Sequence, residues 1–195
     1  MKRVRVTKLC GVIATSWLVV ACGTQQPAGE APAAQAGNGP AQMPHANLAQ
    51  LMRAIPFPNS NIIFDAGSTD PEEAKKAAEG QAGGGSATAN FGNVYAGWQQ
   101  VENAALALSE TANLLMIPGR MCENGKPAPT DREDFRKFVA QLAAAGDAAY
   151  KAAQTKNLDT MLEVGGTVTE ACSACHEVYR DKEDNADRCT PPAAE

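Results

Sequence analysis

Basic residues are scarce in this chain. Seventeen Lys and Arg stand against 22 Asp and Glu, which gives a formal net charge of −5 at pH 7. Residues 1–21 contain four of the basic residues and no acidic ones, so the remainder has 13 basic residues and a net charge of −9. A chain this acidic repels a phosphate backbone, which excludes nucleic acid as a partner. The same charge favours electrostatic steering towards a protein with a basic docking patch.

Long hydrophobic runs are scarce as well. The run from Leu9 to Val20 is too short to span a bilayer and follows a basic cluster at residues 2–8, as in a secretory signal peptide over residues 1–21. It ends in Val19-Val20-Ala21-Cys22, which resembles the lipobox of bacterial lipoproteins, where Cys22 is lipidated after cleavage. An ordinary signal peptide or an N-terminal membrane helix is the alternative. We expect a periplasmic protein anchored to a bacterial membrane through several acyl chains on Cys22.

Export to an oxidising compartment gives the six cysteines different roles. Cys10 leaves with the signal peptide and Cys22 takes the lipid, while two more belong to the motif described next. Cys122 and Cys189 remain as an even pair. A disulfide between them is the economical interpretation, with two unpaired thiols as the alternative.

The strongest motif is Cys172-Ser173-Ala174-Cys175-His176, near the C-terminus. Cys-x-x-Cys-His is the attachment signature of c-type haem. Two thiols three residues apart can each add to a haem vinyl group, and His176 then lies under the iron as the proximal ligand. On a helix, Cys172, Cys175 and His176 share one face, so a single turn can present all three groups. The motif therefore predicts one covalently bound haem c.

Two other kinds of site use the same cysteine spacing. A thioredoxin-like redox pair requires a strand-to-helix setting, which the sequence does not show. A structural zinc site is the stronger alternative, because Cys122 and Cys189 could complete a set of four cysteine ligands. Export from the cytosol favours haem over zinc.

The chain divides into three parts. Behind the signal peptide, residues 22–42 are rich in Ala, Gly, Pro and Gln and predict a disordered tether. Residues 43–195 carry four helical patterns and almost no strand pattern. They predict an all-α domain, an antiparallel four-helix bundle with covalent haem on its last helix. The many alanines in these patterns allow helices to approach closely, with the porphyrin filling the remaining volume.

The first helix is short and separated from the other three. We predict it over residues 44–55, with the prolines of Pro56-Phe57-Pro58 as its stop. Residues 57–64 are predicted to be extended or irregular, yet packed on the core. One or two helical turns over residues 71–78 and a flexible loop over residues 80–89 complete the connection.

The three long helices repeat apolar residues at alternating spacings of four and three. The first begins at Val94 and ends before Pro118. The second begins at a capping box formed by Thr130 and Glu133. The third follows a break at Asn157 and carries the haem cysteines within its buried stripe.

A second axial ligand for the iron has to come from upstream, because no methionine or histidine follows His176. Met161 is excluded, since fifteen residues of helix place it about 22 Å from His176. The remaining candidates are Met43, His45, Met52, Met116 and Met121. Met52, on the apolar side of the first helix, is preferred. An open or water-occupied position and His45 rank behind it, and ordinary core packing is the structural alternative for Met52.

The motif, followed by Tyr179-Arg180 on the last of four helices, resembles the class II c-type cytochromes, that is, the cytochrome c′ family and its low-spin relatives. The similarity covers the architecture of residues 43–181 and is specific only at the motif and its flank. It implies thioethers at Cys172 and Cys175, iron on His176, Met52 at the first-helix ligand position and Arg180 near a haem propionate. The insertion over residues 56–93 and the pair of Cys122 and Cys189 depart from the family pattern.

The resemblance implies one of two haem functions. Some members of the family have an open distal face that binds NO or CO, and others have a first-helix methionine and transfer electrons. We expect an electron carrier that cycles between Fe(II) and Fe(III) with a periplasmic redox partner. No catalytic constellation accompanies the haem, since His45 alone is left for acid–base chemistry, so an enzyme is not expected. A five-coordinate gas-binding protein and a structural zinc lipoprotein are the alternatives, and a homodimer is left open.

Overall fold

The computed structural model describes residues 42–79 and 86–190, which lie within one compact unit, Pro40–Glu195. The predicted signal peptide, the tether before Gln42 and Cys22 lie outside the described residues. The described part contains seven α-helices and one short 3-10 helix. Its only β-pairing is an isolated bridge between Met121 and Pro127. None of the helices in these residues is both long enough and apolar enough to span a bilayer.

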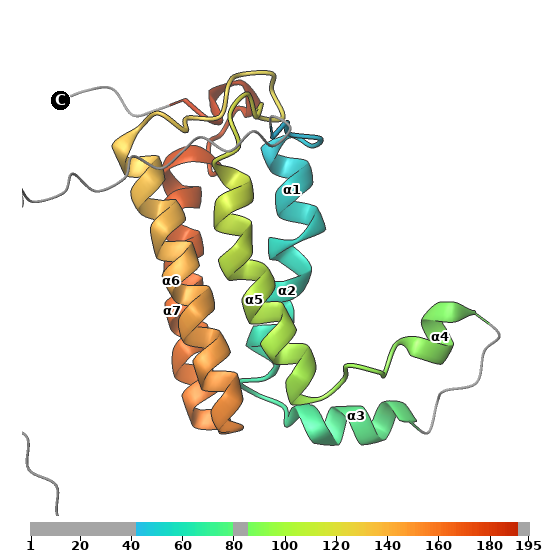
Figure 1. The fold of residues 1–195 in the computed structure, drawn as a ribbon. Helices are drawn as coiled ribbons and strands as arrows, with labels where there is room; N and C mark the ends of the chain where they lie inside the picture. The colour runs from blue at the N-terminus through green and yellow to red at the C-terminus, as the bar shows by residue number, and fades with distance from the viewer. Residues whose placement is uncertain (1–41, 80–85, 191–195) are drawn as a thin grey trace, which may run out of the picture. The chain divides into compact units, whose positions relative to one another are not determined.

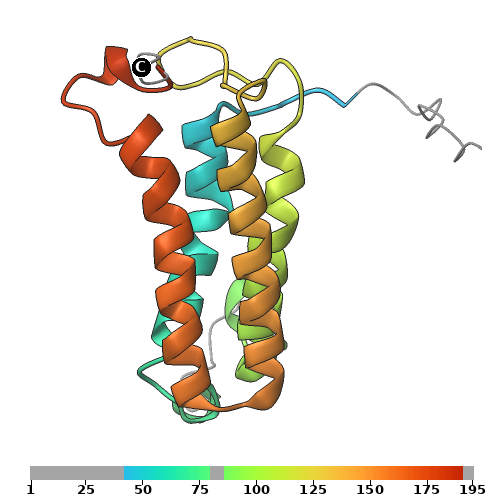
Figure 2. The same cartoon turned by 90° about the vertical axis from the view of Figure 1, so that its left-hand side faces the viewer.

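Five of the helices build an antiparallel four-helix bundle (Figures 1 and 2). They are α1 (Leu48–Ala54), α2 (Pro56–Asp65), α5 (Trp98–Leu115), α6 (Glu133–Thr155) and α7 (Leu158–Tyr179). α1 and α2 follow one another and together form the first helix of the bundle. α5 packs against α2 and α6, and α7 packs against α6 and α2. The predicted all-α bundle is confirmed.

The first predicted helix ends before Pro56, as the prolines indicated, because α1 spans Leu48–Ala54. Ile55 is at once the C-cap of α1 and the N-cap of α2, and α2 begins at Pro56. Proline is tolerated in the first turn of a helix, because the N–H groups there have no acceptor within the helix. The side chain of Asn59 donates to the Ile55 carbonyl at 2.8 Å across the junction. The prolines therefore end α1 and also start α2. The prediction that residues 57–64 are extended or irregular is wrong, since these residues are helical.

The starts of the long helices also differ from the prediction. α5 begins at Trp98, and its N-cap is Gly97 with a φ of 75°, a conformation that favours glycine. Val94 therefore lies before the helix and is 55% exposed. At α6, Arg132 is the N-cap without a side-chain cap, so the predicted capping box does not form. Asn157 does cap α7.

Two short helices lie in the connection between α2 and α5. α3 (Pro71–Glu79) confirms the helical turns predicted there. α4 (Ala87–Phe91) occupies the end of the predicted loop over residues 80–89, so that part of the loop prediction is wrong. Residues 80–85 lie outside the described residues.

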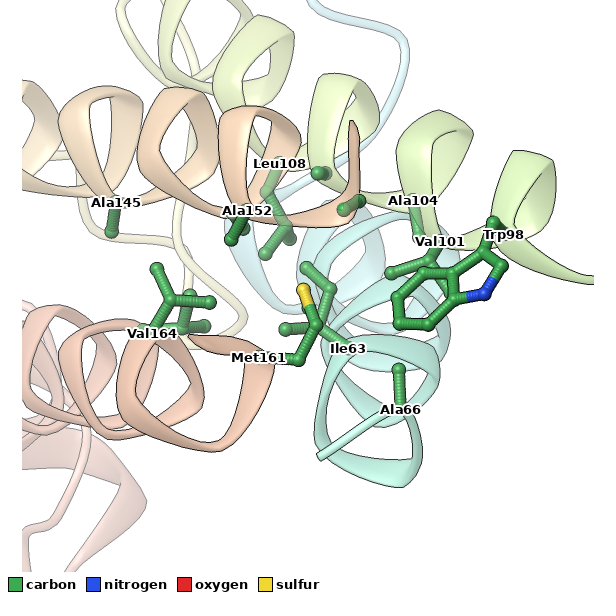
Figure 3. Close-up of a cluster of buried hydrophobic side chains, with 14 of the residues drawn as sticks. Ile63, Ala66, Trp98, Val101, Ala104, Leu108, Ala145, Ala152, Met161 and Val164 are labelled. Carbon is green, nitrogen blue, oxygen red and sulfur yellow. The ribbon is translucent and has the colours of Figure 1, made fainter. Parts of the chain in front are cut away.

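The buried side chains form two clusters along the bundle. The first cluster, here called the lower core, is centred on Ile63 of α2, Leu108 of α5 and Met161 of α7, each 0% exposed, and reaches the haem motif only at Cys172 (Figure 3). Alanines on α5 and α6, such as Ala104 and Ala152, complete it and keep these helices close. The second cluster, the upper core, lies beside the haem motif. Its buried members are Leu51, Ala112, Leu115, Phe135, Val139, Leu142 and Tyr179.

Arg120 fixes the position of α1. Its side chain is only 4% exposed and donates from Nε and Nη2 to the carbonyl of Leu114, at 3.1 and 2.7 Å. Its Nη1 donates to the carbonyl of Ala46 at 2.5 Å, directly before α1. The backbone N–H of Leu48 donates to the carbonyl of Met121 at 2.9 Å. The loop after α5 therefore holds the first turn of α1.

Gly146 marks the close approach of α5 and α6. A Cβ atom at this position would lie 2.6 Å from the backbone nitrogen of Ser109 and 2.9 Å from its Cα. Because a helix backbone cannot move aside as a flexible side chain can, we expect Gly146→Ala to lower the free energy of unfolding by about 1–3 kcal/mol.

Gly166→Ala is the matched control. Gly166 lies within α7, and a Cβ there meets nothing within 4 Å. Helix propensity then predicts a gain of about 0.5–1 kcal/mol. Urea unfolding followed by far-UV circular dichroism measures the unfolding free energy of both variants. A Gly146→Ala variant as stable as the wild type would contradict the close approach of α5 and α6.

Candidate functional site

A cavity of about 520 Å³ lies between the first helix of the bundle, α6 and the C-terminal half of α7. Its volume falls in the range of cavities that hold cofactor-sized molecules. α1 contributes Leu48 and Met52 and α2 contributes Phe57 and Phe64. The lining residues on α6 are Phe135, Phe138, Val139 and Leu142. The wall is therefore largely apolar.

The structure brings all three groups of the haem motif to this cavity. Cys172, Cys175 and His176 lie on α7, line the cavity and are each half-buried. Burial raises the pKa of Cys175 to about 11, and the charges of Cys172 and Asp134 add to this effect. Burial also raises the pKa of Cys172. Both thiols are therefore protonated at neutral pH, unlike the low-pKa thiolate of a redox Cys-x-x-Cys pair.

The pKa of His176 shifts in the opposite direction to the pKa values of the two cysteines, because burial disfavours the charged form of the imidazole. Its pKa lies below the usual value through burial, and the positive charge of Arg180 adds to the effect. The imidazole is therefore neutral at pH 7. Neutral imidazole is the form that ligates a metal, so the position suits a proximal ligand.

Met52 is the one candidate for the second axial ligand that lines the cavity. It is half-buried and packs against the upper core. Met161 lies in the lower core. The other candidates also lie away from the cavity lining, namely Met43 (71% exposed), Met121 (41% exposed), His45 (exposed) and Met116 (half-buried, at the C-cap of α5).

Arg180, which the family resemblance places near a haem propionate, also lines the cavity. Its Nε lies 2.6 Å from Oδ1 of Asp181, and its side chain is 56% exposed. Arg53 and Arg188 line the cavity as well. The sequence pattern had not pointed to these two residues, since neither lies near the motif or on a buried stripe.

Cys122 and Cys189 form a disulfide, as predicted. Their sulfur atoms are therefore not available as the third and fourth ligands of a zinc site. Within the described residues, no group of three or more His, Cys, Asp or Glu side chains is placed to hold a metal ion. The zinc alternative loses its support.

A polar cluster that the sequence did not predict joins the start of α6 to the last turn of α7. Arg132 Nε donates to Asp134 Oδ1 at 3.0 Å and to the hydroxyl oxygen of Tyr179 at 3.0 Å. The Tyr179 hydroxyl donates to Asp134 Oδ1 at 2.8 Å. The Tyr179 ring packs edge-on against Phe135 and Phe138, with centroid distances of 5.6 and 6.4 Å. These contacts fix the turn of α7 that follows His176.

This cluster predicts a pH dependence of stability. The hydrogen bond from Arg132 holds the pKa of Asp134 below its usual value. A carboxylate whose folded-state pKa is lowered stabilises the fold above its unfolded-state pKa, and this contribution is lost as the pH falls through the folded-state pKa. We expect the stability advantage of the wild type over Asp134→Asn to shrink as the pH falls below about 5 and to be lost once Asp134 is protonated in the folded state. Urea unfolding at several pH values measures it.

Asp131→Asn provides the control for this prediction. Asp131 is exposed, and its Oδ1 lies 4.0 Å from Nη2 of Arg136. Such exposed pairs contribute little, so this variant should follow the wild type at every pH. An Asp134→Asn deficit of the same size at pH 7 and at pH 3 would contradict the ionic role of Asp134.

Comparison with known proteins points to one family. Residues 125–180 match the family model described as Cytochrome C'. The matched segment contains the whole of α6 and α7 and includes the haem motif. Searches of curated proteins and of solved structures gave no significant match.

Proposed function

We propose that this chain is a class II c-type cytochrome that binds one haem covalently and carries single electrons. The match of residues 125–180 to the Cytochrome C' family supports this assignment. The observation that carries the proposal is that Cys172, Cys175, His176 and Met52 all line one cavity. The two thiols would form the thioethers, and the imidazole and the methionine sulfur would supply the two axial ligands. When bound, the haem supplies an iron centre that accepts and releases one electron.

The residues of the cavity fit such a group. One side of the cavity offers two protonated thiols and a neutral imidazole from α7. α6 contributes only apolar side chains to the wall, including Phe138 and Leu142, which suit the porphyrin faces. Three arginines in the lining, Arg53, Arg180 and Arg188, suit its carboxylates.

The surrounding side chains would tune the electron affinity of the site. Apolar residues from α1, α2 and α6 exclude water, and a low dielectric strengthens the influence of nearby charges. His and Met as the ligand pair raise the reduction potential of a c-type haem. The contacts of Tyr179 hold the end of α7, so His176 keeps its place during electron transfer.

We propose that the protein works in the periplasm, held to the membrane by lipid on Cys22. The basic and apolar residues 2–20 with the lipobox-like sequence support this location, as does the Cys122–Cys189 disulfide, since disulfides persist in oxidising compartments. The acidic composition supports a redox partner protein with a basic docking patch.

Visible spectroscopy of the full chain, expressed in a host that matures c-type cytochromes, tests the proposal. We expect a pyridine haemochrome spectrum with one haem c per chain, and a low-spin reduced spectrum that CO does not alter. High-spin features with ready CO binding would replace electron transfer by gas binding as the function. A colourless protein would overturn the haem assignment itself.

A further inference from the structure

The segment after α7 folds back to the mouth of the cavity. Arg188 and Cys189 line the cavity together with Arg180, although they lie eight or nine residues further along the chain. The disulfide to Cys122 holds the segment from one side. The backbone N–H of Cys189 donates to the carbonyl of Tyr179 at 2.8 Å and returns the chain to the end of α7.

Two side chains of the loop after α5 hold the same segment. Asn124 Nδ2 donates to the carbonyls of Asn185 and Arg188, both at 2.9 Å. Lys126 Nζ donates to the Thr190 hydroxyl at 2.6 Å. The backbone at residue 188 is thus held by hydrogen bonds at residues 185, 188 and 190 and by the disulfide at Cys189. The side chain of Arg188 therefore has a defined place at the cavity mouth.

The guanidinium of Arg188 is only partly satisfied. Its Nη1 lies 3.5 Å from Oε2 of Glu123, and the side chain is 41% exposed. Its Nε is buried and has no hydrogen-bond partner among the described residues. A buried charged N–H without an acceptor costs free energy, so the position suits an acceptor that arrives with a ligand.

Charge at the cavity mouth also favours an anionic acceptor. Glu123 is shared, since its Oε1 lies 3.3 Å from Nη1 of Arg53 while Oε2 faces Arg188. One carboxylate therefore compensates two guanidinium groups. A second carboxylate would complete the pairing and accept the unused Nε–H of Arg188 in a charge-assisted hydrogen bond.

We propose that Arg188 binds a carboxylate of the haem, and that the Cys122–Cys189 disulfide positions it to do so. This rests on the proposed haem binding and extends it, because the residue comes from the disulfide-held segment and not from the helix that carries the motif. Nη1 remains on Glu123 and Nε donates to the haem carboxylate. Asn124 and the two cysteines of the disulfide act as positioning residues for Arg188.

The test compares holoprotein variants by midpoint potential and by the resonance Raman bands of the haem propionates. Arg188→Gln removes a cation from the cavity mouth, which disfavours the more negative reduced state, so the midpoint potential should fall and the propionate band should shift. Arg188→Lys keeps the charge and should restore most of the potential. Arg136→Gln removes an arginine that does not line the cavity and should leave both readouts unchanged.

The double variant Cys122→Ser/Cys189→Ser tests the positioning. Arg188 is then no longer held covalently, and we expect the same direction of change in both readouts as in Arg188→Gln. A role of Arg188 in stability alone would lower the free energy of unfolding without moving the propionate band. That result, or a wild-type potential in Arg188→Gln, would overturn the inference.

The outcomes separate this inference from the proposed function. Protein that carries one haem c but shows no effect in Arg188→Gln contradicts only the role of Arg188. Protein without haem contradicts both. A propionate band that responds in Arg188→Gln supports the inference whether or not CO binds. Added acetate provides a further test. If it changes the midpoint potential of the wild type but not that of Arg188→Gln, then Arg188 binds carboxylates from solution rather than the haem carboxylate, and the inference is overturned.

Discussion

Replacing Met52 with alanine will let CO bind to the reduced protein at about one equivalent per haem, whereas the wild type will bind essentially none. The reason is the composition of the cavity wall, in which Met52 is the one methionine that lies with His176. Loss of its thioether leaves the sixth position of the iron to water or gas. The spectrum will change from low-spin towards high-spin, and the midpoint potential will fall, because methionine ligation raises it.

Met116→Ala is the matched control for this result. Met116 is also half-buried and packs against the upper core, but it does not line the cavity. Its removal deletes the same atoms, so any effect of lost packing appears in both variants, while the spectrum should stay low-spin. An unchanged spectrum in Met52→Ala would remove Met52 from the ligand role.

The Cys122→Ser/Cys189→Ser variant will lose about 4 kcal/mol of unfolding free energy in the chain-entropy model. The two residues lie 67 positions apart, so the bond closes a long loop in the unfolded chain. The loop between them contains α6 and α7, which means that the bond restricts most of the haem-binding half. The urea midpoint should fall by roughly 2 M.

Asn124→Ala separates the covalent from the polar attachment of the same segment. It removes the bonds to the carbonyls of Asn185 and Arg188 but leaves the disulfide intact. We expect a loss of about 1–2 kcal/mol. A loss in the double cysteine variant as small as that in Asn124→Ala would show that the disulfide hardly limits the unfolded chain.

Local patterns predicted most of the architecture. Apolar periodicity identified the three long helices, and the spacing of Cys172, Cys175 and His176 placed them on one helix face, since both depend only on the geometry of an α-helix. The predictions were wrong where contacts with other parts of the chain determine the local structure. Proline can mark both the end of one helix and the first turn of the next. The prolines after Ile55 do both, and the second role depends on the packing of α2 against α5 and α7, which no local pattern shows.

The predicted capping box failed for a similar reason. The N–H of Thr130 donates to the carbonyl of Ala128, and that of Arg132 to the carbonyl of Pro129. These turns delay the helix until Glu133, and loop geometry of this kind is not visible as a periodicity.

The site was predictable only on its proximal side. The sequence offered several methionines and one histidine for the distal side. The attachment of α1 through Arg120 places Met52 in the lining of the cavity, which supports it as the proposed ligand. The contacts of Tyr179 with Arg132 and of Arg188 with Glu123 join residues 47 and 65 positions apart. No local pattern encodes such pairs.

The break at Ile55 separates α1, which forms the distal side of the site, from α2 and the lower core. Pro56 has no N–H to donate, so the backbone ladder is interrupted between α1 and α2, and α1 is attached instead to the loop after α5. Substitutions in α1 can therefore exchange or remove Met52, the proposed iron ligand, without disturbing the lower core. On the proposed function, a single change at this position would turn an electron carrier into a gas-binding protein and leave the rest of the bundle as it is.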